Sequence, residues 1–447
     1  MALCLAAVLG VGHGSAAAAP LTEDAKREVV AKAATLLAEG YVYPDLGRKA
    51  GAAIQKSLDD GAYAAITDKS AFANRLTDDL QAITHDKHMR VMDPDGPRPP
   101  GMPAGPPPRS RGGFIRVDRL KGDIGYIDLS GFPPPGMFKD AADAALLAVA
   151  GTDALVIDMR RNGGGSPEAV SYLCSFFFDA TRPTHLNDLI WRDRGTETFH
   201  TDSFFTGPAP THYLGKPVIL ITSHFTFSGG EEFTNDLKTQ KRALVVGQTT
   251  GGGANPGGIQ PLGVGLLLFV PSGRAVNPVT KASWEGVGVA PDITTSPEAA
   301  FATAYKAALN AVGASAARAA VKSQLAANGG EVDAWTEASL LAARTGPIPG
   351  AEAVLRATIA DAASGKPNYA AMTPDFIKSA QDQFGVAHND VVVLGALKSV
   401  AFERVDMLGA DVYRATFEHG ALEWTFYVNA EGKVAVAFYR KLPDAPV

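Results

Sequence analysis

The sequence predicts an α/β protein with a helical N-terminal domain, a core built on a largely parallel sheet, and a C-terminal α+β domain. Three patterns support this prediction: apolar residues at helical spacing over residues 22–80, strands alternating with helices over residues 113–295, and short strands separated by turns over residues 399–439. Alternating strands and helices are typical of parallel sheets that are covered on both faces. A chain of 447 residues is also long enough for two or three domains.

The composition excludes several classes of protein. Hydrophobic residues make up 46% of the chain and charged residues 20%, as in folded globular proteins. The net charge of -6 argues against a nucleic-acid partner, because phosphate binding needs a basic surface. Cys4 and Cys174 form neither a disulfide framework nor a zinc site. No segment after residue 20 approaches the run of about 20 apolar residues that a membrane span needs.

An apolar stretch opens the chain, and small residues follow it. Residues 1–20 read MALCLAAVLGVGHGSAAAAP, which resembles the apolar region and cleavage zone of a secretory signal, with cleavage between Ala16 and Ala19. The basic residues that usually precede such a region are missing before Ala2, so an Ala-rich disordered tail is the alternative. The segment predicts a periplasmic or secreted protein.

Residues 21–92 are predicted to form the helical N-terminal domain. Thr22 can cap its first helix, and Glu23 and Asp24 suit the first turn. Two more helices are expected at residues 49–58 and 70–83. The proline-rich residues 93–112 should then form an extended connector, since so much proline cannot pack into a core.

Residues 113–330 are predicted to form the α/β core, and residues 331–447 the C-terminal α+β domain. Core strands are expected at residues 124–129, 154–159, 218–221 and 243–247, with helices at 141–150 and from Ser166. The alanine-rich residues 300–343 also have a helical pattern. A helix from Thr373 and an antiparallel meander should complete the chain.

Ser228 follows an apolar strand and precedes a helical pattern. A serine in that position lies at the carboxyl end of a parallel strand, the edge at which open α/β sheets bind ligands. The helix dipole and the N–H groups of Gly229 and Gly230 would stabilise an oxyanion there. Taken alone, the local sequence favours a simple helix N-cap, because serine is among the most favoured caps.

A second glycine-rich turn supports a catalytic interpretation. Residues 158–165, DMRRNGGG, also follow a buried strand and precede a capped helix. Consecutive glycines let backbone N–H groups approach a substrate closely. Phosphate binding is the rival use, but neither GxxxxGK[ST] nor GxGxxG spacing is present, and no cofactor is predicted.

Four motifs in order resemble those of one peptidase superfamily. They are DMRRNGGG at residues 158–165, TFSGGE at 226–231, VGQTTGGGA at 246–254 and WEGVGVAPD at 284–292. The chain thus resembles the C-terminal-processing/tricorn serine peptidases, in the branch that includes bacterial homologues of interphotoreceptor retinoid-binding protein. This resemblance implies a crotonase-like core, a peptide or protein substrate, Ser228 as nucleophile, and Gly229 and Gly164 as oxyanion donors.

Two departures from the superfamily indicate which base the enzyme uses. Gly252 or Gly253 stands where the Ser–Lys proteases carry their lysine, and the proline-rich connector is too short for a PDZ domain. Both point to the tricorn-like arrangement, in which a histidine is the base. His88, in a segment that resembles the D-x-H of this branch, is the candidate.

Glu285 would orient His88 and stabilise its imidazolium form, as the third group of a triad does. The bridging serine that precedes the histidine in tricorn is Lys87 here. Glu285 therefore contacts His88 directly or through water, or else pairs with Lys87 in a structural role. His85 and His88 could suggest a metal pair, but no third ligand follows, so no metal site is predicted. His85 and His224 are interpreted as solvated or structural.

Two other functions remain open on the sequence. A non-catalytic carrier of lipid or retinoid-like ligands could use the apolar runs at residues 176–178 and 266–269 to line a pocket, although burial in a core is the commoner role of such runs. An esterase would use the same machinery on a different bond. The oligomeric state is not predicted.

Overall fold

The computed structural model describes residues 20–96, 110–120, 122–312, 346–406, 410–428 and 432–442. The predicted signal segment and most of the proline-rich connector lie outside these residues, as does the alanine-rich stretch after residue 312. The described residues divide into two units, of which the first comprises residues 20–85, 89–96 and 258–270. Residues 86–88 belong to the second unit, with the rest of the chain. Within the described ranges, no helix combines the length and apolar character that crossing a membrane requires.

The first unit contains the predicted helices and one hairpin from much later in the chain. Its helices are α1 (Glu23–Gly40), α2 (Pro44–Asp59) and α3 (Lys69–Thr84). Thr22 caps α1 by accepting a hydrogen bond from the Ala25 N–H at 3.2 Å. Strands β1 (Arg90–Met92), β10 (Leu266–Pro271) and β9 (Gly257–Gly263) pair in that order. Leu266 and Leu268 of the apolar run are buried in this helical core.

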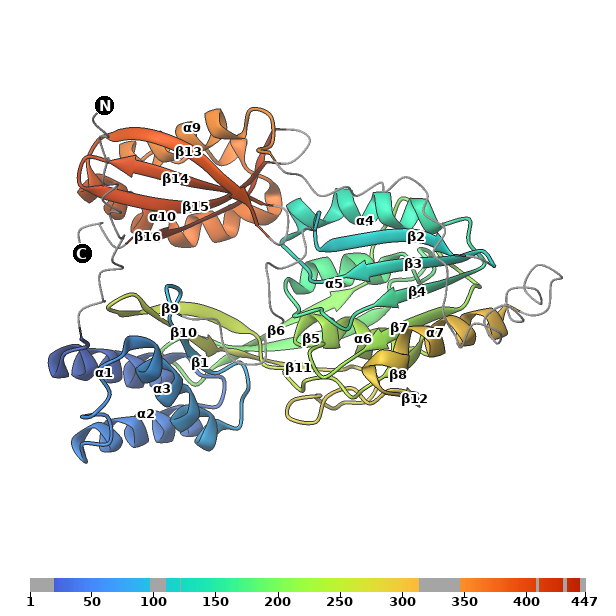
Figure 1. The fold of residues 1–447 in the computed structure, drawn as a ribbon, viewed down its shortest axis with the longest axis horizontal. Coiled ribbons are helices and arrows are strands. Elements are labelled where there is room, and N and C mark those ends of the chain that lie inside the picture. Colours follow the sequence, from blue (N-terminus) through green and yellow to red (C-terminus); the bar gives the residue numbers. More distant parts are fainter. Residues whose placement is uncertain are drawn as a thin grey trace, which may run out of the picture. The chain divides into compact units, whose positions relative to one another are not determined.

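A six-stranded sheet forms the centre of the second unit (Figure 1). Its strands, in spatial order, are β12 (Ile293–Thr294), β8 (Leu244–Gly247), β7 (Val218–Thr222), β4 (Ala154–Asp158), β3 (Ile124–Leu129) and β2 (Phe114–Leu120). All neighbours pair in parallel except β2, which is antiparallel to β3. The prediction of a largely parallel sheet is therefore confirmed.

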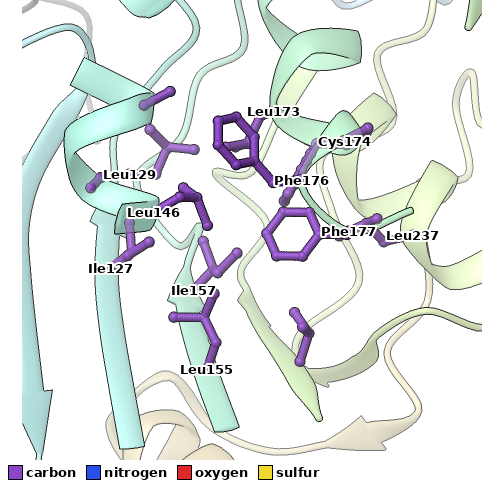
Figure 2. Packing of buried hydrophobic residues seen from close by; sticks show 14 of the residues in the cluster. Ile127, Leu129, Leu146, Leu155, Ile157, Leu173, Cys174, Phe176, Phe177 and Leu237 are labelled. Atoms are coloured by element: carbon purple, nitrogen blue, oxygen red, sulfur yellow. The ribbon is translucent and has the colours of Figure 1, made fainter. Parts of the chain in front are cut away.

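Helices cover both faces of this sheet. Side chains from α4 (Pro135–Val149), α5 (Pro167–Ser175) and α6 (Gly229–Thr239) share one buried cluster with Leu155 and Ile157 of β4. Figure 2 shows these two residues beside Leu146 of α4 and Phe177. The alternate residues of β4 instead pack with α7 (Pro297–Ala311). Burial on both faces explains why β4 is apolar throughout rather than alternating.

Two antiparallel sheets complete the second unit. Strands β11 (Gly273–Val276), β5 (His185–Arg192) and β6 (Phe199–Phe205) form the smaller sheet in that order. The C-terminal part has helices α9 (Ala351–Ser364) and α10 (Pro374–Leu394), with a short 3-10 turn (Tyr369–Ala371) between them. The sheet that follows is β13 (Leu397–Val405), β14 (Asp411–Phe417), β15 (Gly420–Val428) and β16 (Val434–Lys441). The predicted meander is thus present, and the fold class is confirmed.

Helix α6 buries the carboxyl groups of Glu232 and Asp236, one turn apart on one face, in addition to that of Glu231. Glu232 is 6% exposed and Asp236 is not exposed at all. Among the described residues, Glu232 Oε1 and both carboxyl oxygens of Asp236 have no hydrogen-bond partner. Burial raises the pKa of Glu232 to about 8, and burial together with the nearby Glu232 raises the pKa of Asp236. Both groups therefore favour the neutral form in the folded protein.

These two carboxyls should make stability depend on pH. Between the ordinary glutamate value of 4.5 and about 8, the folded state holds protons that the unfolded state has lost, so stability should fall as the pH rises. A Glu232→Gln, Asp236→Asn double variant has no such protons, and its free energy of unfolding should fall less over this range. Denaturant unfolding at pH 5 and pH 8 measures the difference, with exposed Asp202→Asn as the control. An equal fall in wild type and double variant would contradict the expectation.

Candidate active site

Ser228 lies in a strained turn between β7 and α6. It occupies the N-cap position of α6, but its backbone has φ 52° and ψ -124°. An ordinary N-cap residue has extended backbone angles, and positive φ is uncommon for any residue with a side chain. Such strain persists only when the surrounding structure enforces it, and it concentrates at functional sites. A sharp, strained turn from strand to helix is also how the nucleophile elbow of α/β-hydrolases exposes its serine.

The turn at residues 158–165 packs directly against Ser228. Gly164 has φ +95°, and a Cβ placed on it would lie 2.6 Å from the Gly229 nitrogen and 2.7 Å from the Ser228 Cβ. Only glycine fits there, because such distances are shorter than non-bonded atoms tolerate. The structure therefore brings together Ser228, Gly229 and Gly164, as the sequence predicted.

The backbone nitrogens of Gly164 and Gly165, both in this turn, have different surroundings. The Gly164 N–H donates to the Asn162 side chain at 2.9 Å. The Gly165 nitrogen lies close to Gly229, since a Cβ placed on Gly229 would lie 3.1 Å from it. The sequence did not single out Gly165 as a neighbour of the nucleophile turn.

Glu231 ties the nucleophile turn to the loop at residues 249–254. Its side chain is fully buried. One carboxyl oxygen accepts from the N–H groups of Ser228 at 3.0 Å and Gly253 at 2.7 Å. The other accepts from the Gly252 N–H at 2.6 Å and from the Thr250 hydroxyl. Hydrogen bonds to a buried carboxylate are among the stronger ones in proteins, so Glu231 fixes both loops.

Replacing Glu231 with glutamine should misplace the nucleophile without unfolding the protein. The new amide group would face N–H donors, and displacement of a catalytic group by about 1 Å costs about 100-fold in rate. We expect kcat to fall by that order with little change in KM. Thr250→Val, which removes one of the four donors, is the matched control and should lose much less. A folded Glu231→Gln variant with normal kcat would contradict this role.

His88 is buried next to the residue that precedes the nucleophile. Its ring centroid lies 4.5 Å from that of Phe227. A Cβ placed on Gly253 would lie 2.8 Å from His88 Cε1. The His88 backbone N–H donates to Asp86 at 2.9 Å, and the other oxygen of Asp86 accepts from the Asn255 side chain at 2.9 Å. The segment that carries His88 is thereby fixed to the loop that follows Gly253.

Asp86, His88 and Glu285 form one cluster. One side-chain nitrogen or oxygen of each lies within 4.8 Å of those of the other two. Glu285 Oε2 accepts from the Ala254 N–H at 2.5 Å. Burial, followed by the negative charge of Asp86, raises the pKa of Glu285 to about 7. The structure therefore brings His88 and Glu285 together and adds Asp86, a carboxylate for which no role was predicted from the sequence.

The remaining polar residues have simpler surroundings. Lys87 donates to the Gly251 carbonyl. His85 ends α3 in a left-handed conformation with φ 54°, and it is exposed. His224 is exposed beside Phe225, with the ring centroids 3.9 Å apart. Glu231 is the last residue of the TFSGGE motif, and Asp86 is the first residue of the D-x-H segment. The position of Asp86 two residues before His88 was the one signal in the sequence that could have identified Asp86 as a site residue.

A small cavity adjoins Ser228. Its volume is about 30 Å³, and Leu189, Ala275 and Trp284 form an apolar wall. This volume admits about one water molecule. It is far below the volume of roughly 300–1,000 Å³ of sites that enclose drug-sized ligands. The cavity therefore suits a small group placed next to the serine better than a stored lipid.

The fold and this arrangement define an α/β protein with a serine-bearing turn set against a glycine-rich turn. Residues 123–295 match peptidase family S41, and residues 16–109 match the N-terminal domain of Peptidase_S41 in eukaryotic IRBP. The match of residues 123–295 to this family confirms the resemblance seen in the motifs.

Known proteins resemble parts of the chain. Carboxyl-terminal-processing peptidase 2, chloroplastic, of Arabidopsis thaliana is 30% identical over 172 residues, which are 38% of this chain and 31% of that protein. The chain thus matches about a third of the length of that relative. A putative peptidase from Parabacteroides merdae has a TM-score of 0.47 at 18% identity, covering 66% of this chain and 97% of its own. The tricorn protease has a TM-score of 0.40 at 14% identity, covering 67% of this chain and 37% of its own.

Proposed function

We propose that the protein is a serine peptidase that hydrolyses peptide bonds of a peptide or protein substrate through an acyl-enzyme on Ser228. The observation that carries this proposal is the strained backbone of Ser228 at the strand–helix junction, with the glycine turn in contact. An N-cap serves its helix without strain, whereas a nucleophile must project its hydroxyl toward a substrate. The match of residues 123–295 to a peptidase family supports the same reaction.

In the proposed reaction, His88 is the general base. It takes the proton of the Ser228 hydroxyl as the oxygen attacks the substrate carbonyl, and it later gives that proton to the leaving amine. Water then hydrolyses the acyl-enzyme by the same route. The Gly229 N–H would donate to the oxyanion, joined by the Gly164 N–H once the substrate displaces the Asn162 side-chain oxygen from it.

The acidic groups around His88 would stabilise its charged form. Asp86 and Glu285 lie in the same cluster, so an imidazolium ion formed during the reaction would gain two nearby negative charges. Because the pKa of Glu285 is raised to about 7, its ionisation should contribute to the pH profile near neutrality. Glu285 thus has the role of the third triad member in this proposal.

Labelling with a fluorophosphonate tests the proposal. The activated Ser228 oxygen should attack phosphorus and displace fluoride, leaving a stable adduct that peptide mapping assigns to Ser228. Labelling should disappear in Ser228→Ala and persist in Ser203→Ala, a serine exposed on β6. A folded wild-type protein that resists labelling would contradict the proposal and favour the non-catalytic carrier. Labelled protein that cleaves small esters and no peptide would favour an esterase.

We further propose a periplasmic or secreted location. Its support is the apolar opening of the sequence with small residues after it, which suits a secretory signal. Fractionation of cells that express the chain, with the mass of the product measured, tests this location. Full-length protein found only in the cytoplasm would contradict it.

A further inference from the structure

The cluster of Asp86, His88 and Glu285 offers the ligand types that a transition-metal ion prefers. One imidazole nitrogen and two carboxyl oxygens lie within 4.8 Å of one another. Zinc is commonly held by three such protein ligands, with water in a fourth, open position. We propose that Asp86, His88 and Glu285 form a binding site for Zn²⁺ that, when filled, switches the enzyme off. The inhibitory part of this inference rests on the proposed function of His88.

The geometry needs little adjustment to hold the ion. Ligand atoms about 2.1 Å from a tetrahedral zinc ion are about 3.4 Å from one another. Donors that already lie within 4.8 Å reach this separation through small side-chain rotations. Calcium takes six to eight oxygen ligands and magnesium an octahedral set, so a site with one nitrogen and two carboxylates selects zinc over either.

The backbone around the cluster orients two of the ligands. Asp86 is 1% exposed, and the His88 N–H and the Asn255 side chain bond its two oxygens. Glu285 is held at Oε2 by the Ala254 N–H. Partners of this kind orient metal ligands and raise affinity.

One carboxyl oxygen of the cluster has room for a ligand bond. Glu285 Oε1 is shielded from solvent and has no hydrogen-bond partner among the described residues. A shielded oxygen without a partner requires an explanation such as water or an ion. The cluster places two carboxyl groups beside a single imidazole, so a divalent cation would relieve the repulsion between them.

Zinc and catalysis would compete for the same imidazole. A metal ion takes the lone pair with which His88 would accept the serine proton, so a zinc-bound enzyme has no base. The inhibition should therefore be reversible on chelation. No covalent change is involved.

Calorimetric titration of the full-length Ser228→Ala variant with ZnCl₂ tests the site without any need for activity. We expect one ion per chain and a raised melting temperature. Since orienting partners alone contribute 10–100-fold to metal affinity, loss of a ligand in His88→Gln should weaken binding at least about 100-fold. Glu285→Gln should also weaken it. His224→Gln, which removes an exposed histidine, should bind as the parent does.

Two results would overturn the site: no zinc binding by the parent variant, or equal binding after His88→Gln and Glu285→Gln. If His88→Gln disturbs folding, Glu285→Gln keeps the test informative, because Glu285 is only half-buried and its replacement should be tolerated. Wild-type labelling by fluorophosphonate should slow in ZnCl₂ and recover with a chelator, and it should be unaffected by CaCl₂. Zinc binding without any labelling would uphold the metal site and reject the catalytic proposal, whereas labelling without zinc binding would do the reverse.

Discussion

Replacing Ser228 with alanine should reduce peptide hydrolysis by about 10⁴- to 10⁶-fold while leaving the fold intact. The variant loses the only oxygen that forms the acyl-enzyme in the proposed route, and removal of a catalytic serine has effects of this size. The strained φ of 52° is set by contacts of the surrounding turn, so alanine should adopt it too. The ratio kcat/KM on a peptide substrate measures the loss, and thermal unfolding verifies the fold.

Ser203→Ala is the matched control for this substitution. Ser203 is exposed on β6, where it donates to Asp188 at 2.6 Å, and its loss should leave kcat/KM unchanged. Parental hydrolysis by a folded Ser228→Ala variant would show that another residue is the nucleophile. A variant that fails to fold would show instead that Ser228 acts in the elbow mainly as a structural residue.

Replacing His88 with glutamine should have the second-largest effect, a fall in kcat of about 10³-fold or more. Glutamine fills similar space and cannot accept the serine proton at neutral pH, and loss of the base costs nearly as much as loss of the nucleophile. The residual rate should rise steadily with pH, because hydroxide replaces the missing base. The dependence of kcat/KM on pH measures this residual rate.

His224→Gln controls for the loss of a histidine close to the nucleophile in sequence. His224 is exposed, and its ring lies on Phe225. It should keep both the rate and the shape of the pH profile. If His224→Gln removes activity and His88→Gln keeps it, the base has been assigned to the wrong residue.

Much of the fold could be predicted because its signals are local. The apolar runs at residues 154–159 and 218–221 predicted strands of a covered parallel sheet, and β4 and β7 lie there inside the six-stranded sheet. Thr22 and Ser166 were predicted as caps, and each accepts a hydrogen bond from the N–H three residues later. These features depend on neighbours within a few residues, so the sequence around them contains the information.

Strands that pair over long distances were missed. Strands β5, β6, β9 and β11 were not predicted, and β10 was described only as an apolar run. The hairpin of β9 and β10 pairs with β1, where Val91 faces Leu268, and so joins the helical unit. No local pattern specifies a partner so distant in the chain, because β-structure depends on cross-strand packing more than on the preference of one segment.

The sequence by itself determined the parallel core, the resemblance to a peptidase family, and the two glycine-rich turns at residues 158–165 and 226–231, because each is written in a short run of residues. Only the tertiary structure decided that Ser228 is strained, that Glu231 joins two loops, and that Asp86 and Glu285 lie beside His88. The physical reason is that the role of a buried carboxylate depends on its hydrogen-bond partners. For Glu231 and Glu285 these partners are backbone N–H groups, which every residue but proline carries and which folding alone brings into place.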